Sequence, residues 1–168
     1  MNECYCLPNK NYLNLCPRIA IGQLLGDYHL VCPTILLSEQ LAKHSSTDGG
    51  NTFFTYRLVQ HLEVAHNPME HFPWQGVTHG EDSMYIYAIP LLQKAEDRLL
   101  SRSMITAWTN FAKSGHPGVV GGIQWEEAFQ NRKRPVTRHL SLHTNDFKMV
   151  SGAFAKNCDA LWKNRITQ

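Results

Sequence analysis

Residues 95–117 read AEDRLLSRSMITAWTNFAKSGHP, and they carry the clearest helical pattern in the chain. Gly115 suits the left-handed turn that ends many helices, and Pro117 prevents the helix from continuing. The sequence therefore predicts an amphipathic helix over residues 95–114. Its apolar stripe consists of residues spaced three or four positions apart, which places them on one helix face: Leu100, Met104, Trp108 and Phe111.

The segments on either side of this helix predict β-strands and shorter helices. Residues 52–59 (TFFTYRLV) are rich in β-branched and aromatic side chains, and residues 138–143 (RHLSLH) alternate between polar and apolar. Short helices are expected over residues 81–89 and 151–163. This order indicates an α/β layer fold. Since two strands do not make a proper sheet, we expect an incomplete sheet with amphipathic helices.

The N-terminal part of the chain divides into two segments. Residues 1–25 show no clear periodicity and form a poorly specified segment. A helix is expected from Asp27 to about residue 43, because an aspartate at the N-cap accepts hydrogen bonds from the first turn. Pro33 fits only near the first turn of that helix, or it kinks the helix. Residues 26–168 are expected to belong to a single domain.

Composition excludes several classes of protein. The chain has 168 residues, of which 43% are hydrophobic and 18% charged, so we expect a globular protein rather than a disordered one. Its net charge of +2 gives no reason to expect a nucleic-acid partner. We find no apolar run close to the about 20 residues of a membrane helix, and no signal-peptide pattern at the start. The sequence therefore predicts no membrane span.

Histidine and cysteine spacings do not match a metal site. His61 and His66 are five residues apart, whereas zinc proteases place two histidines four apart on one helix face. His139 and His143 are four apart, but on a predicted strand they would be about 13 Å from one another. We expect neither a metal nor another cofactor. The cysteine count is odd, which leaves at least one cysteine unpaired within the chain: Cys4, Cys6, Cys16, Cys32 and Cys158.

Four short segments carry a family resemblance. They are residues 26–33 (GDYHLVCP), 74–82 (WQGVTHGED), 108–117 (WTNFAKSGHP) and 158–162 (CDALW). Each is similar to a motif of the type-B carboxylesterases and cholinesterase-like proteins, which are α/β-hydrolases. One such motif is weak evidence, but four in the family's order are specific. The resemblance implies that residues 26–168 correspond to the C-terminal portion of a type-B carboxylesterase domain, an α/β-hydrolase.

The resemblance gives His79 a catalytic role. In this family the histidine of the second motif is the general base that takes a proton from the nucleophilic serine and returns it to the leaving alcohol. The chain contains neither the Gly-x-Ser-x-Gly turn of the nucleophile nor the glycine-rich oxyanion segment. Glu81 and Asp82 cannot easily serve as the triad acid, because they follow His79 on a new helix. We therefore expect a hydrolase portion that is inactive alone and meets an ester substrate only in a full-length protein.

The resemblance also implies a disulfide between Cys32 and Cys158, because the cysteines of the first and fourth motifs pair in the family. Such a bond requires an oxidising compartment, so we expect a secreted protein although this chain shows no signal peptide. Two buried free thiols of an intracellular protein are the alternative. The pairing of Cys4, Cys6 and Cys16 stays open.

A second function fits the same resemblance. Neuroligin-type adhesion proteins keep the fold and often lack the serine, so the chain could be part of a non-catalytic interaction protein. The residue at the nucleophile turn would distinguish the two, and this chain does not contain that turn. A free-standing domain with a new role is the least favoured interpretation. The sequence does not identify the ester substrate or the oligomeric state.

Overall fold

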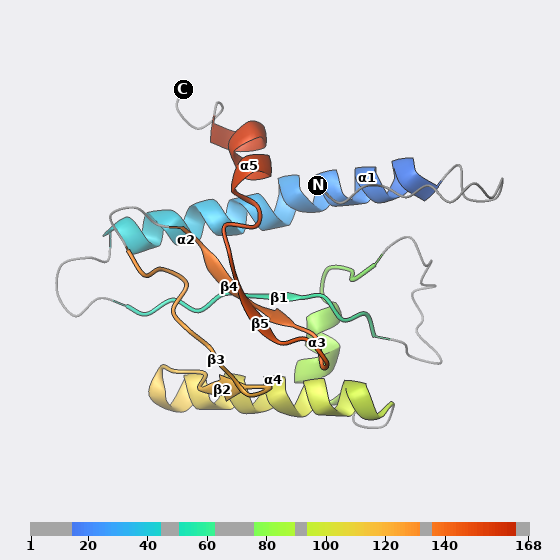
Figure 1. Ribbon diagram of the computed structural model, residues 1–168, viewed down its shortest axis with the longest axis vertical. Helices are drawn as coiled ribbons and strands as arrows, with labels where there is room; N and C mark the ends of the chain where they lie inside the picture. The colour runs from blue at the N-terminus through green and yellow to red at the C-terminus, as the bar shows by residue number, and fades with distance from the viewer. Residues whose placement is uncertain (1–14, 45–50, 63–75, 90–93, 132–135, 164–168) are drawn as a thin grey trace.

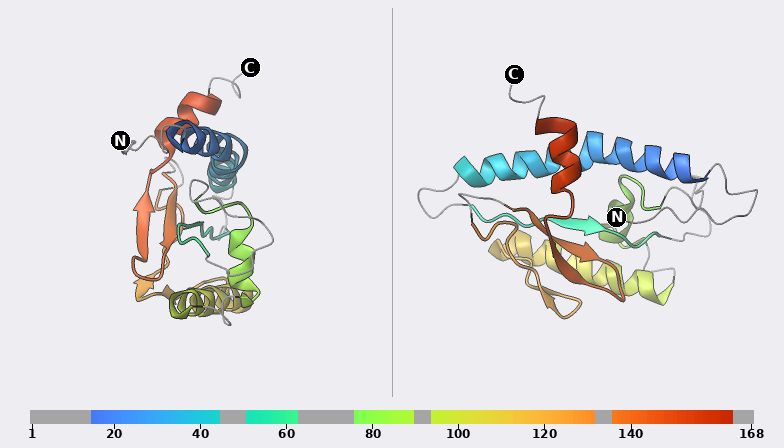
Figure 2. Two further views of the ribbon diagram at one scale, coloured as in Figure 1. Left: turned by 90° about the vertical axis from the view of Figure 1, so that its right-hand side faces the viewer. Right: turned by 45° about the horizontal axis from the view of Figure 1, so that its top comes forward.

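The computed structural model describes residues 15–44, 51–62, 76–89, 94–131 and 136–163, and the fold is given for these residues. They form three layers (Figures 1 and 2). A small mixed β-sheet lies in the middle. A long N-terminal helix crosses one side of it, and helix α4 (Ala95–Ser114) lies on the other side. The helices and the mixed sheet agree with the α/β class expected from the sequence.

Helix α4 has the bounds that its sequence predicts. Gly115 adopts the left-handed conformation at its end, with φ 75°, and its N–H donates to the Phe111 carbonyl at 2.8 Å. The predicted stripe is buried at Leu100 and Met104, but Phe111 is 46% exposed. The stripe therefore meets the core over the middle of the helix and leaves it toward the C-terminal end.

The sheet has three strands in the order β1-β4-β5. Strand β1 (Tyr56–Leu58) pairs in parallel with β4 (Arg138–Leu142), with Tyr56 opposite Leu140. Strand β4 pairs antiparallel with β5 (Lys148–Ser151). The predicted strand over 138–143 is confirmed to within one residue, and the strand over 52–59 is shorter than expected.

The main core lies between the sheet and α4. Alternate residues of β1 and β4 face it, and Tyr85 of helix α3 (Glu81–Ile86) fills the space beside them. Trp125, which follows a small hairpin of β2 (Val119–Val120) and β3 (Ile123–Gln124), covers the other end of the cluster. Several of the apolar side chains in this cluster are completely buried: Tyr85, Leu100, Met104, Leu140 and Leu142.

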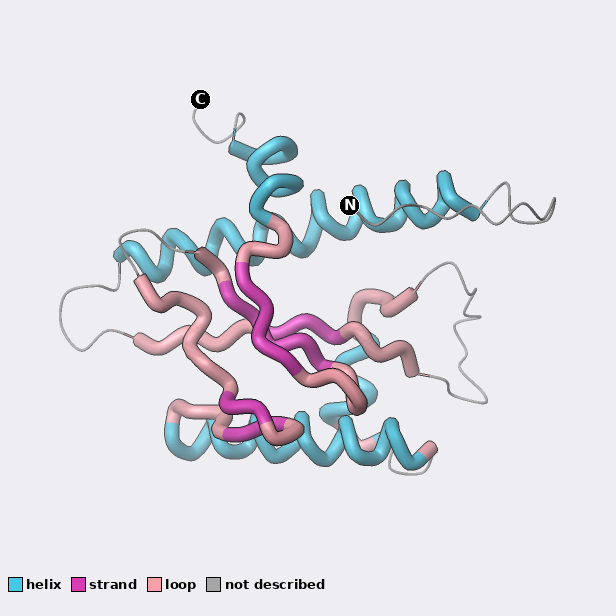
Figure 3. Tube along the Cα trace, in the orientation of Figure 1, coloured by secondary structure: helices cyan, strands magenta, loops and turns pink. Residues whose placement is uncertain are grey.

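The N-terminal helix differs from our prediction. Helix α1 (Leu15–Gly26), a π-helical turn η1 (Asp27–Val31) and helix α2 (Cys32–His44) follow one another without a break (Figure 3). Asp27 is therefore inside a helix and not an N-cap, and residues 15–25 are ordered helix rather than an unspecified segment. Residues 1–14 lie outside the described part.

The π-helical turn explains how Pro33 is accommodated. A proline inside an α-helix lacks the N–H donor, and its ring collides with the carbonyl four residues earlier. Here the preceding turn is wider, and the Cys32 N–H donates to the Asp27 carbonyl, five residues back. The widened turn relieves the steric conflict that ends or kinks an ordinary helix at proline.

The long helix also bears on membrane association. Its section Ile19–His44 is long and apolar enough to cross a membrane by length and composition, and 6% of the most apolar window is buried. The sequence prediction missed this section because Asp27, Glu39 and Lys43 interrupt it. One such helix near the N-terminus is weak evidence, because soluble core helices and signal sequences have the same composition.

Two other elements end or begin where the sequence did not predict. Helix α3 stops at Ile86 instead of residue 89, and Ala88 takes a positive φ of 64°. The predicted helix over 151–163 is instead a short α5 (Ala155–Cys158) followed by a π-helical turn η3 (Asp159–Lys163).

Candidate active site

His79 lies in a tight turn between the end of a loop and helix α3. The turn is closed by a hydrogen bond from the Glu81 N–H to the Thr78 carbonyl at 3.2 Å. Gly80 follows His79 with φ 84°, a left-handed conformation that glycine adopts without steric cost. The His79 side chain is exposed, so a reacting group can reach it.

The Glu81 carboxylate is buried beneath this turn and is 5% exposed. Its Oε2 accepts hydrogen bonds from the Thr78 N–H at 2.9 Å and the Thr78 hydroxyl at 3.3 Å. Its Oε1 accepts from the Leu62 N–H and lies 2.7 Å from Nδ1 of His61. One side chain thus ties the turn that carries His79 to the segment that follows β1.

Asp82 makes a second connection between α3 and β1. Its Oδ2 accepts a hydrogen bond from the Tyr56 hydroxyl at 2.5 Å. Burial, and then the hydrogen bond and charge of Asp82, raise the pKa of Tyr56 above its ordinary value. Tyr56 therefore stays protonated at neutral pH and remains a donor to the carboxylate.

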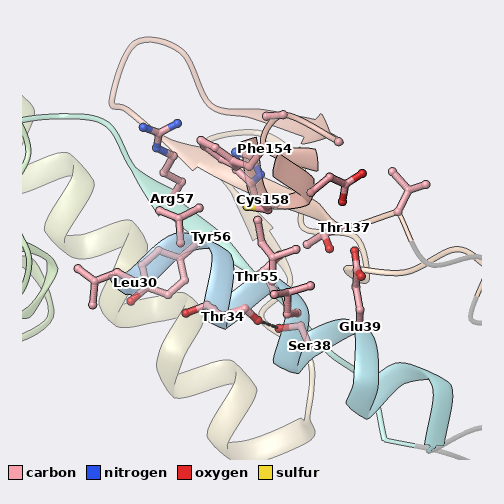
Figure 4. A pocket seen from close by; sticks show the side chains of 18 of the residues that line it. Leu30, Thr34, Ser38, Glu39, Thr55, Tyr56, Arg57, Thr137, Phe154 and Cys158 are labelled. Atoms are coloured by element: carbon pink, nitrogen blue, oxygen red, sulfur yellow. Dashed lines mark hydrogen bonds between the residues drawn. The ribbon is translucent and has the colours of Figure 1, made fainter. Parts of the chain in front are cut away.

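A cavity of about 730 Å³ lies between the long helix and the second face of the sheet (Figure 4). The lining of this cavity includes His79, Tyr56 and Asp82, so the candidate histidine lies at the cavity wall. Apolar and hydroxyl side chains from α2 form one wall, and the strands and the segment after β5 form the others. The residues that define these walls include Leu30, Thr34, Ile35, Ser38, Thr55, Arg57, Thr137, His139 and Phe154.

Burial shifts the pKa values of two titratable side chains in the cavity wall, Arg57 and His139. The Arg57 guanidinium carbon lies 4.5 Å from the centre of the Phe154 ring. Burial lowers the pKa of Arg57, and the charge of Asp27 opposes that shift. Burial, followed by the charge of Arg57, also lowers the pKa of His139, so this imidazole is neutral at pH 7.

A disulfide joins Cys32 to Cys158, and this prediction is confirmed. The two Cα atoms are 5.1 Å apart and both cysteines are buried. Beside the bond, the Trp162 Nε1–H donates to the Tyr28 carbonyl at 3.2 Å, and the two rings stack with centroids 4.8 Å apart. The C-terminal segment is therefore fixed to the π-helical turn.

The remaining candidate residues do not come together at a site. His61 contacts Glu81, while His66, Cys4 and Cys6 lie outside the described residues. Among the described residues, no three His, Cys, Asp or Glu side chains could hold a metal ion. The sequence indicated only that Glu81 begins a helix after His79, and its role as an acceptor was not predicted. The only signal was its position three residues after Thr78, the spacing at which a side chain reaches back to an N–H.

Comparison with known proteins identifies the family. Residues 4–161 match the description "Carboxylesterase family". The chain belongs to the carboxylesterase family. Its helices and mixed sheet agree with the α/β-hydrolase fold of that family.

The relatives are cholinesterases. The chain is 27% identical to the cholinesterase of Mus musculus over 151 residues, which cover 87% of this chain and 23% of the relative. It is 29% identical to acetylcholinesterase-1 of Trittame loki over 150 residues, covering 87% and 24%. Acetylcholinesterase 1 of Caenorhabditis briggsae is 35% identical over 116 residues, covering 64% and 16%. The chain thus spans about a quarter or less of the length of these relatives.

Proposed function

We propose that this chain is the C-terminal portion of a serine carboxylic-ester hydrolase and supplies the triad histidine, His79. The observation that carries the proposal is the placement of His79. It is exposed in a turn fixed from below by Glu81, and it faces a cavity. Membership in the carboxylesterase family and the similarity to cholinesterases support hydrolysis over the adhesion function.

His79 has the properties that a general base needs. Within the described part of the chain its ring makes no hydrogen bond, so one nitrogen can face a serine and the other a carboxylate. A neutral imidazole can take a proton from the serine, and the imidazolium that forms can return it to the leaving alcohol. The fixed turn holds the ring for both steps.

The proposed role requires groups from outside this chain. The sequence has no Gly-x-Ser-x-Gly turn, and Glu81 and Asp82 are already occupied by His61, Leu62, Thr78 and Tyr56. Without a nucleophile, the covalent route to ester hydrolysis is closed. The purified chain should therefore show no turnover of an aryl ester above that of the solvent.

A chimaera tests the role of His79. In the cholinesterase of Mus musculus, the matched portion is replaced by this chain, and hydrolysis of an aryl ester is measured. Changing His79→Ala should lower kcat by about 10⁴-fold, because the loss of a triad member has that effect. His44→Ala is the matched control, since His44 is exposed at the end of α2 and its ring contacts the Gln40 carbonyl of the same helix. A folded chimaera that keeps its turnover after His79→Ala would contradict the proposal.

The disulfide supports an oxidising location for the protein. Disulfides persist in secreted proteins and are reduced in the cytosol. Because Cys32 and Cys158 are bonded in the structure, we propose that the protein resides in an extracellular or secretory compartment. A non-reducing peptide map of the protein from its native source should contain the cross-linked pair, and two free thiols would contradict this location.

A further inference from the structure

We propose that Glu81 is a positioning residue whose carboxylate, through its hydrogen bonds, sets the conformation of the turn that carries His79. The importance of this turn for catalysis rests on the proposed function of His79. We call the contacts of the Glu81 carboxylate with Thr78, Leu62 and His61 the Glu81 clamp. This clamp depends only on contacts within this chain. Helix α3, which begins at Glu81, lies beside the end of β1 in both views of Figure 2.

The clamp joins two segments that are distant in the sequence. Each carboxylate oxygen of Glu81 accepts one backbone N–H, from Thr78 at Oε2 and from Leu62 at Oε1. The Thr78 hydroxyl and the His61 ring add one contact to each oxygen. A carboxylate with two oxygens and about four acceptor sites satisfies all of these groups at once.

This arrangement requires a carboxylate rather than a polar side chain of the same shape. A glutamine has one carbonyl oxygen and one NH₂ group, and the NH₂ group cannot accept a hydrogen bond. Since a backbone N–H points at each oxygen position, the NH₂ group introduced by Glu81→Gln would face a donor whichever way the amide turned. One buried N–H would lose its partner, which is costly because the group is also removed from water.

Loss of one of these hydrogen bonds would loosen the turn in which His79 lies. Thr78 and Glu81 are the first and last residues of the turn, and His79 and Gly80 are its two central residues. The backbone bond from Glu81 to Thr78 closes the turn, while the Glu81 side chain anchors Thr78 to the segment after β1. The Gly80 carbonyl also accepts the Ser83 N–H at 3.1 Å, which ties the end of the turn to the start of α3. The Glu81 side chain anchors the other end of the turn, at Thr78, so the order of His79 depends on both anchors.

Backbone dynamics of the isolated chain test the proposal. NMR order parameters are measured for Thr78, His79 and Gly80 in the wild type and in Glu81→Gln. Rigid backbone gives values near about 0.85, and flexible backbone gives values below about 0.6. We expect ordered values in the wild type and flexible values in the variant. Amide exchange at Leu62 and Thr78 should accelerate at least about tenfold.

Glu96→Gln is the matched control. Glu96 also lies in the first turn of a helix, α4, but its side chain is exposed. This variant should leave the His79 turn ordered and exchange at Leu62 and Thr78 unchanged. Order parameters within α4 should be the same in all three proteins. A role of Glu81 in overall stability alone would lower the melting temperature and leave the turn ordered.

The outcomes separate the clamp from the catalytic role. A folded Glu81→Gln protein with an ordered His79 turn would overturn the clamp. If that variant does not fold, the measurements on the wild type test the proposal. Rapid amide exchange at Leu62 and Thr78, or a flexible His79 backbone, would overturn it. Protection of both amides from exchange would support it. These measurements need no turnover, so a chimaera that does not require His79 would reject the catalytic role and leave the clamp intact.

Discussion

Among single residues, buried Tyr85 connects three separate segments. Its hydroxyl donates to Oδ1 of Asp97 at 3.1 Å, and Gln60 donates to the same oxygen at 2.9 Å. Its carbonyl accepts from the Ser101 hydroxyl at 2.6 Å. Burial, with the charge of Asp97 next, raises the pKa of Tyr85. The phenol therefore remains a neutral donor to a buried carboxylate, and its ionisation would break the network.

This shift predicts a loss of stability at alkaline pH. The unfolded pKa of tyrosine is about 10, and the folded pKa of Tyr85 is higher, so its contribution is complete below about pH 10 and declines as the pH rises further. Each such tyrosine lowers the free energy of unfolding by up to about 1.4 kcal/mol per pH unit, and Tyr56 acts in the same direction. Urea titrations between about pH 9 and 11 should therefore show a shallower decline in Tyr85→Phe than in the wild type.

Tyr87→Phe is the control for this measurement. Tyr87 caps the end of the same helix and is 78% exposed. The variant should follow the wild-type decline with pH. Equal slopes for Tyr85→Phe and Tyr87→Phe would show that burial of Tyr85 does not perturb its ionisation.

Among elements, the β2–β3 hairpin depends on two glycines with different surroundings. Gly121 has φ 57° and Gly122 has φ 82°, so both occupy the left-handed region. A Cβ on Gly121 would overlap the Phe147 ring, whereas a Cβ on Gly122 would meet nothing within 4 Å. Of these two glycines, Gly121 is therefore the one that lies against the Phe147 ring.

Alanine at each glycine should separate strain from steric overlap. Gly122→Ala introduces only the left-handed strain, which costs about 1–2 kcal/mol. Gly121→Ala has the same strain and must also displace the Phe147 ring, so it should cost about a further 1–3 kcal/mol. The free energies of unfolding in urea give the comparison. An equal loss in the two variants would mean that the Phe147 ring moves aside without cost.

The sequence predicted elements whose signals are local. Helix α4 has a one-sided apolar stripe with Gly115 and Pro117 after it, and its predicted bounds are those observed. Helix α1 has apolar residues on all sides, so no stripe marked it. Strand β5 has four residues and is defined by its pairing with β4, which no local pattern encodes.

In the candidate site, too, residues marked by a local pattern were predicted and contacts between distant segments were not. His79 and the disulfide cysteines were named from family motifs. A motif of a few residues is enough for this, because the family already links those residues to a place in the fold. The anchoring by Glu81 was not predicted, since it requires that residues 60–62 return to the start of α3. Contacts between distant segments set the geometry of the turn, and one segment alone does not contain them.

In the whole molecule, the middle of the long helix is held to the C-terminal segment of α5 and η3, and Ala42 near its C-terminal end packs with Ala128 and Phe129. In the middle of the helix, Cys32 is bonded to Cys158, the Asn157 amide donates to Asp27 at 3.1 Å, and Trp162 stacks on Tyr28. The two ends of the helix carry exposed apolar side chains. The side chains concerned are Ile21, Leu24, Leu25, Leu37 and Leu41.

The disulfide should therefore determine how firmly this layer is attached. It joins residues 126 positions apart and closes a long loop in the unfolded chain. Reduction followed by thiol blocking should lower the free energy of unfolding by about 2–5 kcal/mol, the range observed when native disulfides are removed. Amide exchange should rise first at the start of α2 and in α5, which the bond connects directly. Urea unfolding and hydrogen exchange of the oxidised and reduced proteins measure both effects.

The double variant Cys32→Ser/Cys158→Ser isolates this bond from the remaining cysteines, Cys4, Cys6 and Cys16. Its stability should already be close to that of the reduced wild type, and reduction should change it far less than it changes the wild type. The serines fill nearly the same volume as the buried sulfurs, so the difference reports the cross-link more than a cavity. If reduction destabilised the double variant as much as the wild type, another bond would be holding the helix, and the attachment assigned to Cys32 and Cys158 would be wrong.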